Sequence, residues 1–275
     1  MECTGLVLGV GEVGRPLLKM LQTRYPKTRM YDPKYPEESI DPHKHQFNIL
    51  HVCFPETPKF KEYVLNAIVR FRAKIVIIHS SVSPGTSYYI QEEARQVAIL
   101  YSPVRGNLKD GMMNGLKSYT KYIAYAEGHP EGALDTDPLT VEEYLLKAGF
   151  IVKWAESAET LEWAKSMDLV LYGLNIIFAQ ILERSTYFEG VDYDTIAEFI
   201  TSSESESGGT VKRNLHHGGY IGGHCVMQAV DRVAYSLSRS DPSAKDLINA
   251  MKLSNSMRLT ELSTQGVPAH HPKTN

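Results

Sequence analysis

The chain has 275 residues, of which 43% are hydrophobic and 22% charged, and its net charge at pH 7 is −3. This length suffices for one large or two ordinary domains, and the composition is typical of a soluble globular protein. The charge favours neither a nucleic acid nor an anionic membrane as partner. The apolar runs are too short to span a bilayer, and the first residues lack the basic region of a signal peptide. Three cysteines without paired spacing predict free thiols in a reducing cytoplasm.

The first part of the chain alternates short apolar runs with amphipathic stretches. Candidate strands cover 5–10, 28–33, 48–54, 73–80, 98–103 and 119–126. Helical spacing of apolar residues covers 14–25 and 60–71, and one more helix and strand follow within 140–155. This alternation predicts a parallel sheet with helices on both faces. We therefore expect an α/β domain of the Rossmann type over residues 1–157.

The rest of the chain is helical in pattern. Residues 158–190 keep helical spacing with no proline, after a cap at Ser157 or Glu159 and before a stop at Gly190. A shorter helix is expected over 192–203, followed by a polar loop over 203–214. Two further helices are expected over 226–240 and 242–262. These patterns predict an all-α substrate and dimerisation domain over 158–265, built on a long connecting helix, and a disordered tail over 266–275. Because long apolar helices between domains often pack against a second copy, we expect a homodimer through 158–190.

A glycine motif follows the first predicted strand. The sequence "GVGEVG" comprises Gly9, Gly11, Glu12, Val13 and Gly14. Between a strand and a helix, such glycines permit a tight turn, approach of a pyrophosphate to the backbone, and close helix packing. Asp32 ends the second strand, where a carboxylate binds ribose hydroxyls and repels a 2′-phosphate. The motif therefore predicts NAD as the cofactor; the alternative is a glycine turn that binds nothing.

Two later loops follow the third and fourth strands. The first, "CFPETP", begins with Cys53, Phe54 and Pro55, and the second, "HSSVSPGTS", contains Ser80 and Ser81. Ligands of open parallel sheets lie at this carboxyl edge, so both loops are predicted to contact the cofactor. The alternative is that the prolines end strands and the serines cap helices.

The stretch "GGYIGGHCVMQAVDR", residues 218–232, places two glycine pairs before His224 and Cys225. Gly219, Gly222 and Gly223 would let a substrate approach the backbone. Cys225 precedes a predicted helix, and a cysteine nucleophile reacts as the thiolate, which a helix N-terminus stabilises. A buried apolar cysteine is the alternative. The histidines near Cys225 lack a second ligand pair, so no metal site is expected.

Taken together, these motifs resemble the nucleotide-sugar dehydrogenases, the family of UDP-glucose and GDP-mannose dehydrogenases. The resemblance also includes "YSPVRG" at 101–106 and a lysine on the long helix, and it covers roughly residues 5 to 260. It implies oxidation of a primary alcohol of a sugar nucleotide to a carboxylate, with two NAD and a covalent thioester on a cysteine.

Roles for individual residues follow from the resemblance alone. Cys225, beside His224, matches the nucleophile, and Lys165 matches a lysine that steadies the oxyanion. Ser81 stands where the family has a threonine that helps hold the catalytic water. Arg105 matches an arginine of a substrate-binding "SPER"-like loop.

The chain also departs from the family pattern. Val104, Leu169 and Ala229 stand where the family has a glutamate, an asparagine and an aspartate. Family members also continue into a third, nucleotide-binding domain that this sequence lacks. Two alternatives therefore stay open. One is a two-domain β-hydroxyacid dehydrogenase that uses Lys165 for a two-electron oxidation; the other is an NAD-binding protein without catalysis.

Overall fold

A computed structural model describes residues 4–41, 45–106, 111–130, 141–223 and 225–264. The chain forms two compact units, Met1–Lys165 and Ser166–Asn275. The sequence predicts a boundary after residue 157, whereas the division falls inside one continuous helix. The predicted tail at 266–275 lies outside the described residues.

The first unit is built on a seven-stranded sheet with the order β2-β1-β3-β4-β5-β6-β7. Its strands are β1 (Gly5–Leu8), β2 (Arg29–Tyr31), β3 (Ile49–Val52), β4 (Ile75–Ile78), β5 (Ala98–Tyr101), β6 (Thr120–Tyr125) and β7 (Ile151–Trp154). Every strand lies within a stretch that the sequence predicts to be one. The predicted fold class, an α/β Rossmann-type domain followed by helices, is confirmed.

One pair of strands differs from the expected parallel arrangement. β6 pairs with β5 in the antiparallel sense, with Leu100 opposite Tyr125 and Tyr101 opposite Ala124. A parallel pair needs a crossover long enough to carry the chain back along the sheet. In the described part of the connection from β5 to β6, the seven-residue helix α4 (Met112–Ser118) is the one regular element, and it is too short for such a crossover.

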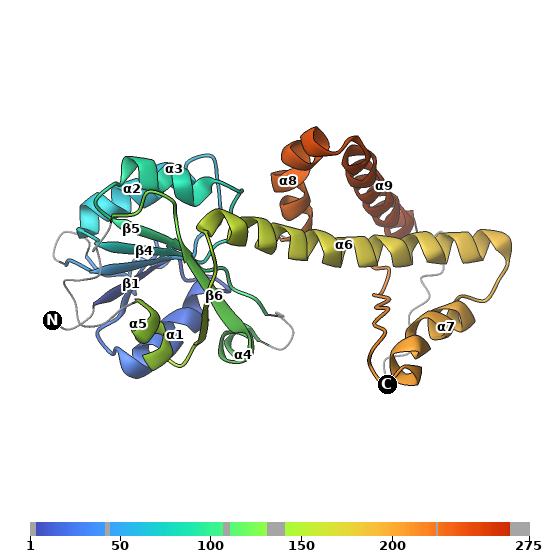
Figure 1. The fold of residues 1–275 in the computed structure, drawn as a ribbon, viewed down its shortest axis with the longest axis horizontal. Coiled ribbons are helices and arrows are strands. Elements are labelled where there is room, and N and C mark those ends of the chain that lie inside the picture. The colour runs from blue at the N-terminus through green and yellow to red at the C-terminus, as the bar shows by residue number, and fades with distance from the viewer. Residues whose placement is uncertain (1–3, 42–44, 107–110, 131–140, 224, 265–275) are drawn as a thin grey trace. The chain divides into compact units, whose positions relative to one another are not determined.

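Helices cover both faces of this sheet (Figure 1). One face carries α2 (Phe60–Phe71) and α3 (Thr86–Glu93), and the other carries α1 (Gly14–Arg24), α4 and α5 (Val141–Lys147). Two clusters of buried apolar residues fill the two spaces between sheet and helices. Because both faces of the inner strands are covered, β1, β3 and β5 are buried along their whole length.

The long helix α6 (Ala158–Glu189) begins in the first unit and continues through the second. The Ser157 hydroxyl accepts a hydrogen bond from the Thr160 N–H at 3.1 Å, which caps the first turn. Gly190, with a φ of +67°, ends the helix, because L side chains rarely adopt this conformation. Both predicted ends of the helix are confirmed.

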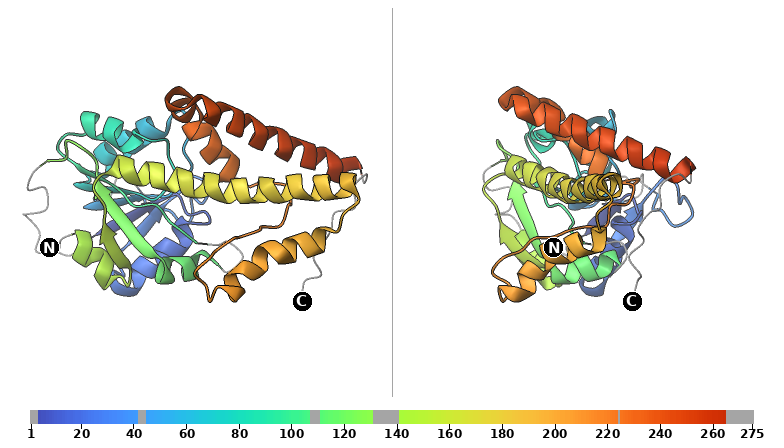
Figure 2. Two further views of the ribbon diagram at one scale, coloured as in Figure 1. Left: turned by 45° about the vertical axis from the view of Figure 1, so that its right-hand side comes forward. Right: turned by 90° about the vertical axis from the view of Figure 1, so that its right-hand side faces the viewer.

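The described residues of the second unit form helices and no strand. α6 is followed by α7 (Tyr193–Glu206), α8 (Val226–Ser240) and α9 (Pro242–Thr264). α7 extends into the predicted polar loop, and none of its residues is buried. Figure 2 shows α9 alongside the second part of α6.

Among the described residues, α6 is the one helix long and apolar enough to cross a membrane by length and composition alone. The core helix of a soluble protein meets the same test. Its buried Glu183 pairs with Arg258 of α9, so this face of α6 packs against protein.

Candidate functional site

The turn between β1 and α1 contains two glycines that the fold itself requires. Gly9 has a φ of +83°, which L side chains rarely adopt. A methyl group on Gly14 would lie 1.9 Å from the carbonyl oxygen of Gly9, so no side chain fits there. These two positions let the strand and the helix approach closely.

Gly11 differs from the other two glycines of the motif. A methyl group on Gly11 would meet no atom of the described residues within 4 Å. Packing within the protein therefore gives no reason for glycine at this position. Glu12 is exposed and Val13 occupies the N-cap position of α1, so the free space lies at the start of a helix. Such a place suits a phosphate group, because the first backbone N–H groups of a helix have no partner within it.

The Asp32 carboxylate lies beside this turn. Its Oδ2 accepts a hydrogen bond from the Val10 N–H at 2.8 Å, and its Oδ1 accepts one from the Lys34 N–H at 2.9 Å. Each carboxylate oxygen can accept a second bond, so both retain capacity for a hydroxyl. This arrangement supports the predicted ribose-binding role of Asp32.

The loops after β3 and β4 meet at the same edge of the sheet. The Ser80 hydroxyl donates to the carbonyl oxygen of Phe54 at 2.6 Å, and the Phe54 N would lie 2.9 Å from a methyl group on Gly9. Pro55 follows Phe54 in the same loop. The structure therefore brings together Gly9, Gly14, Cys53, Phe54 and Ser80 from three predicted cofactor-binding segments.

Two side chains of these loops have contrasting surroundings. Burial raises the pKa of the Cys53 thiol to about 12, so Cys53 is a packing residue of this edge and not a second nucleophile. Ser81 is half-buried, and its hydroxyl has no hydrogen bond among the described residues. Its hydroxyl is therefore available to a ligand or a water molecule.

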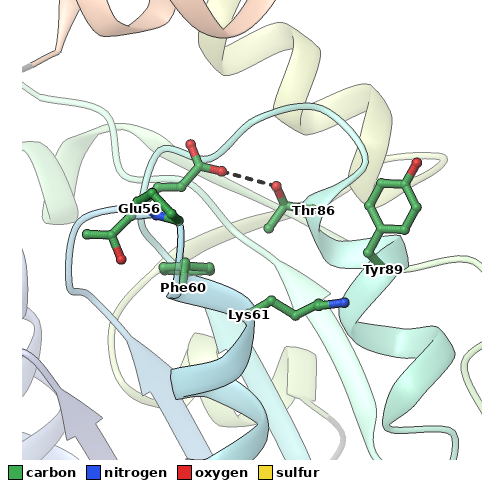
Figure 3. A pocket seen from close by; sticks show the side chains of 7 residues that line it. Glu56, Phe60, Lys61, Thr86 and Tyr89 are labelled. Carbon is green, nitrogen blue, oxygen red and sulfur yellow. Dashed lines mark hydrogen bonds between the residues drawn. The ribbon is translucent and has the colours of Figure 1, made fainter.

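A small pocket of about 200 Å³ lies at the rim of the same two loops (Figure 3). The Glu56 carboxylate accepts hydrogen bonds from the Ser83 N–H at 2.8 Å and the Thr86 hydroxyl at 3.2 Å, which joins the loops. Lys61 and Tyr89 line the opposite side (Figure 3). The pocket is smaller than usual ligand sites, and we assign Glu56 a structural role.

Glu162, which the sequence analysis missed, lies under the start of α3. Its carboxylate accepts hydrogen bonds from the Gly85 N–H at 2.6 Å, the Ser87 N–H at 2.9 Å and the Ser87 hydroxyl at 2.6 Å. Burial raises its pKa to about 7, although the bonds from Ser87 and Gly85 oppose the shift. Glu162 thus joins the first turn of α6 to the loop that carries Ser81. The sequence signal that could have pointed to Glu162 is an acidic residue three positions before Lys165 in the same predicted helix.

A buried chain of hydrogen bonds crosses the centre of the first unit. His79 Nδ1 lies 2.9 Å from the Ser102 carbonyl oxygen, and His79 Nε2 lies 3.0 Å from His51 Nδ1. His51 Nε2 lies 3.0 Å from the Tyr144 hydroxyl. Burial lowers the pKa of His51 to about 3 and that of His79 well below its usual value, so both rings are neutral.

This neutrality fixes the direction of every bond in the chain. A carbonyl oxygen only accepts, so His79 donates from Nδ1 and must accept at Nε2. His51 then donates from Nδ1 and accepts at Nε2 from the Tyr144 hydroxyl. All ring nitrogens of the pair are satisfied without a charge, as a buried polar network requires. Two histidines inside otherwise apolar strands were the sequence signal for this network.

Lys121 of β6 adds an ammonium group to the same network. Its Nζ donates to the Ser102 carbonyl oxygen at 2.7 Å, and only 3% of the residue is exposed. Its pKa is lowered to about 7, chiefly by burial; Cys53 opposes this shift, and the nearby charge of Lys165 contributes to it. The Ser102 carbonyl oxygen thus receives two donors, which fixes the start of the loop "SPVRG".

The side chains of Val104 and Arg105 in that loop pack against the first unit, although the buried Arg105 Nε has no hydrogen-bond partner among the described residues. The Arg105 guanidinium lies over the rings of Tyr119 and Tyr122, at 5.4 and 5.2 Å, and donates to the Thr120 carbonyl oxygen at 3.2 Å. Val104 is buried in an apolar cluster. Val104, which stands where the resembled family has a glutamate, is therefore a residue of the apolar core.

The predicted catalytic residues lie in both units. Lys165 is half-buried on α6 at the end of the first unit, one turn before the half-buried Leu169. In the second unit Cys225 is exposed at the N-cap position of α8, with Gly222 and Gly223 exposed before it. His224 lies outside the described residues. Ala229 is fully buried one turn into α8.

No three His, Cys, Asp or Glu side chains come together as metal ligands in the part of the chain that the structure describes.

Solved structures with a similar fold are dehydrogenases. UDP-D-ManNAc dehydrogenase from Pyrococcus horikoshii has a TM-score of 0.71 and 16% identity, over 96% of this chain and 72% of that chain. The fold is that of these dehydrogenases. A UDP-glucose dehydrogenase from Pyrobaculum islandicum has a TM-score of 0.70 and 16% identity, over 97% and 72% of the two chains. No family model and no curated protein sequence matches the chain.

A third similar structure is shorter. The 3-hydroxyisobutyrate dehydrogenase from Mycobacterium tuberculosis has a TM-score of 0.65 and 14% identity, and the similarity covers 94% of each chain. The fold expected from the resemblance to nucleotide-sugar dehydrogenases is thus confirmed, and this shorter dehydrogenase shares it.

Proposed function

We propose that the protein is an NAD-dependent oxidoreductase that oxidises a CH–OH group of a sugar nucleotide or a related small substrate. The observation that carries the proposal is the turn at Gly11. Glycine there has no packing reason within the described residues, and the Asp32 carboxylate lies beside it with unused acceptor capacity. A dinucleotide supplies both the phosphate and the ribose that these positions suit.

The residues around the turn fit NAD better than NADP. Asp32 would repel a 2′-phosphate. One nearby cation, Arg15, is paired with Glu38, with 3.2 Å between Nη1 and Oε2, and lies 5.1 Å over the ring of Tyr35. Its charge is therefore already balanced within the loop after β2. When bound, NAD accepts the hydride that leaves the substrate.

The roles of the remaining residues follow the resemblance. Lys165, a cation at the end of the first unit, would stabilise the negative oxygen that forms as the alcohol loses its proton. Ser81 has a hydroxyl available to hold water. Cys225 would add to the carbonyl carbon of an aldehyde to form the C–S bond of a thiohemiacetal. Loss of a proton and of a hydride from this adduct, the hydride to a second NAD, would give the thioester, and its hydrolysis would release the acid and restore the thiol. Its exposure at a helix N-terminus supports this role.

A second candidate function is a two-electron oxidation of a small hydroxy acid. Two observations favour it: the similarity to the 3-hydroxyisobutyrate dehydrogenase covers 94% of both chains, and Val104 and Ala229 are buried where a four-electron enzyme of the resembled family has acids. In this reaction Lys165 acts on the alcohol and Cys225 has no covalent role.

Ligand binding and two variants distinguish these functions. We expect NAD, and not NADP, to raise the thermal stability of the protein, because a ligand that binds the native state stabilises it. With a substrate found by screening sugar nucleotides and hydroxy acids, Lys165→Ala should abolish NADH formation in both cases. Cys225→Ala should abolish acid formation in the first case alone. NAD binding without turnover on any substrate would instead indicate a non-catalytic NAD-binding protein.

The exposed apolar face of α6 supports a homodimer. Leu171, Phe178, Ile181 and Phe188 are 61%, 52%, 45% and 86% exposed and fall within about 100° of one another at 100° per residue. A second copy would cover this face. The cytoplasmic location expected from the unpaired cysteines stays a prediction for cell fractionation.

A further inference from the structure

The segment before Cys225 packs closely against α6 within the second unit. A methyl group on Gly218 would lie 3.0 Å from the Gln180 N and 3.1 Å from the Ala179 carbonyl carbon. The backbone of the segment therefore lies on the backbone of the helix, with no side chain between them. Contact this close fixes the path of the chain at its first glycine.

Asn255 of α9 holds the same segment from another side. Its Oδ1 accepts a hydrogen bond from the Ile221 N–H at 2.8 Å, and its Nδ2 donates to the Ile221 carbonyl oxygen at 3.1 Å. One side chain thus satisfies both backbone groups of Ile221, as a neighbouring strand would. Asn255 and Ile221 are 6% and 7% exposed, so these backbone groups would otherwise be buried without partners.

Gln180 of α6 makes the third bond to this segment. Its Nε2 donates to the Gly219 carbonyl oxygen at 2.8 Å, and its Oε1 accepts from the Ser254 hydroxyl at 2.8 Å. Gln180 is fully buried. Because Ser254 and Asn255 are adjacent on α9, the two amides form one connected group around the Gly219–Ile221 backbone.

The chain is held again just after Cys225. Val226, the first residue of α8, is 8% exposed, and a methyl group on Gly173 of α6 would lie 2.7 Å from Val226 Cγ1. Cys225 thus lies between two anchored points, Ile221 and Val226. Between them a methyl group on Gly223 would meet no described atom within 4 Å, and Cys225 is exposed. The thiol is open to a ligand while the chain on both sides is fixed.

We propose that Gln180 and Asn255 are positioning residues that fix the Gly219–Ile221 backbone and thereby the place of the Cys225 thiol. The inference rests on the proposed function, in which Cys225 is the nucleophile. The two amides touch no reacting atom. They are neutral, so they hold the loop by hydrogen bonds without adding a charge near the thiol. A displacement of about 1 Å can cost an enzyme about a hundredfold in rate, which is why such a loop needs fixed ends.

Two variants of Asn255 test the role in a graded way. Asn255→Leu has a similar size and removes both bonds to Ile221, whereas Asn255→Asp keeps the acceptor for the Ile221 N–H. We expect hydrogen exchange of the Ile221 amide to be about tenfold faster in Asn255→Leu and less affected in Asn255→Asp. The aldehyde-to-acid rate should fall about a hundredfold in Asn255→Leu and be partly rescued in Asn255→Asp, with NAD affinity unchanged in both.

Asn175→Leu is the matched control, because the Asn175 side chain donates within its own helix, to the Leu171 carbonyl oxygen at 2.9 Å. Asn175→Leu should keep the wild-type hydrogen exchange of the Ile221 amide and the wild-type rate of acid formation. Gln180→Met, which removes the bond to Gly219, should raise the rate of hydrogen exchange at 219–221 and lower the rate of acid formation. This variant tests the positioning role if Asn255→Leu does not fold.

The outcomes separate the two proposals. If the wild type binds no NAD, or Cys225→Ala still forms acid at the full rate, the proposed function is wrong and the positioning role falls with it. If Cys225 is essential but Asn255→Leu and Gln180→Met form acid at the wild-type rate, the positioning role alone is wrong. Unchanged exchange at Ile221 in folded Asn255→Leu would also overturn it.

Discussion

The two units of the molecule bury their side chains differently. In the first unit, two apolar clusters fill both faces of the sheet, and the buried polar groups form a mostly uncharged network around His51 and His79. In the second unit, α6 and α9 are joined by buried polar and charged groups, among them Gln180, Asn255 and the Arg258–Glu183 pair. Large apolar side chains of α6, α7 and α9 are exposed instead.

This difference indicates what each unit needs to be stable. A sheet covered on both faces has its own core and can hold a precisely shaped turn for a cofactor. The second unit leaves a continuous apolar face on α6, which is typical of a surface that another protein covers. We therefore expect changes in the first unit to act on folding and cofactor binding, and changes on the exposed face of α6 to act on association.

The largest effect should come from the glycine turn of the first unit. Gly14→Ala places a methyl group 1.9 Å from the Gly9 carbonyl oxygen, so the helix must move. We expect a loss of roughly 3 kcal/mol or more in the free energy of unfolding and no NAD binding. Gly11→Ala is the control for stability, because the new methyl group meets no described atom. Gly11→Ala should unfold in urea like the wild type yet bind NAD more weakly. A loss of stability as large as that of Gly14→Ala would contradict this expectation.

The buried Lys121 predicts a pH dependence of stability. Its pKa falls from 10.5 to about 7 on folding, because burial disfavours the ammonium. Between these values the unfolded chain binds more protons, so this group makes stability rise with pH, by at most about 1.4 kcal/mol per pH unit. Lys121→Met should remove that rise between pH 7 and pH 10.5. Parallel stability curves for the two proteins, measured by urea unfolding, would show that Lys121 titrates normally.

Association should depend on the second unit. Phe178→Glu places a charge in the middle of the exposed apolar face of α6, where Phe178 is 52% exposed. We expect the dimer to weaken by roughly 2 kcal/mol, because a buried unpaired charge opposes association. Sedimentation at several concentrations measures this change. The control, Val69→Glu, changes a side chain of α2 in the first unit that is 78% exposed and should leave association unaffected. A wild type that is monomeric at micromolar concentration would refute the interface.

The smallest effect should come from the pair Arg15–Glu38, which lies on the surface beside the cofactor turn. Both side chains are about half exposed, so Glu38→Gln should leave stability almost unchanged. The variant should bind NADP more tightly than the wild type, because Arg15 loses its partner and becomes available to a phosphate. Unchanged NADP affinity by calorimetry would show that Arg15 lies too far from the ribose to matter.

Local patterns in the sequence determined the fold of the first unit and the start of its site. Strand and helix alternation, the glycine motif and Asp32 act over a few residues, and the structure has them as predicted. The same holds for the long helix, whose ends at Ser157 and Gly190 depend on local capping.

Only the tertiary structure decided what each polar side chain does. His51 and His79 are 28 residues apart yet share a hydrogen bond, and Asn255 meets Ile221 across 34 residues. Neither contact has a local signature, because partners so distant in sequence are chosen by packing of whole elements. The same packing buried Val104, placed the half-buried Arg105 over the ring of Tyr122, and left the Cys225 thiol exposed between two anchored points.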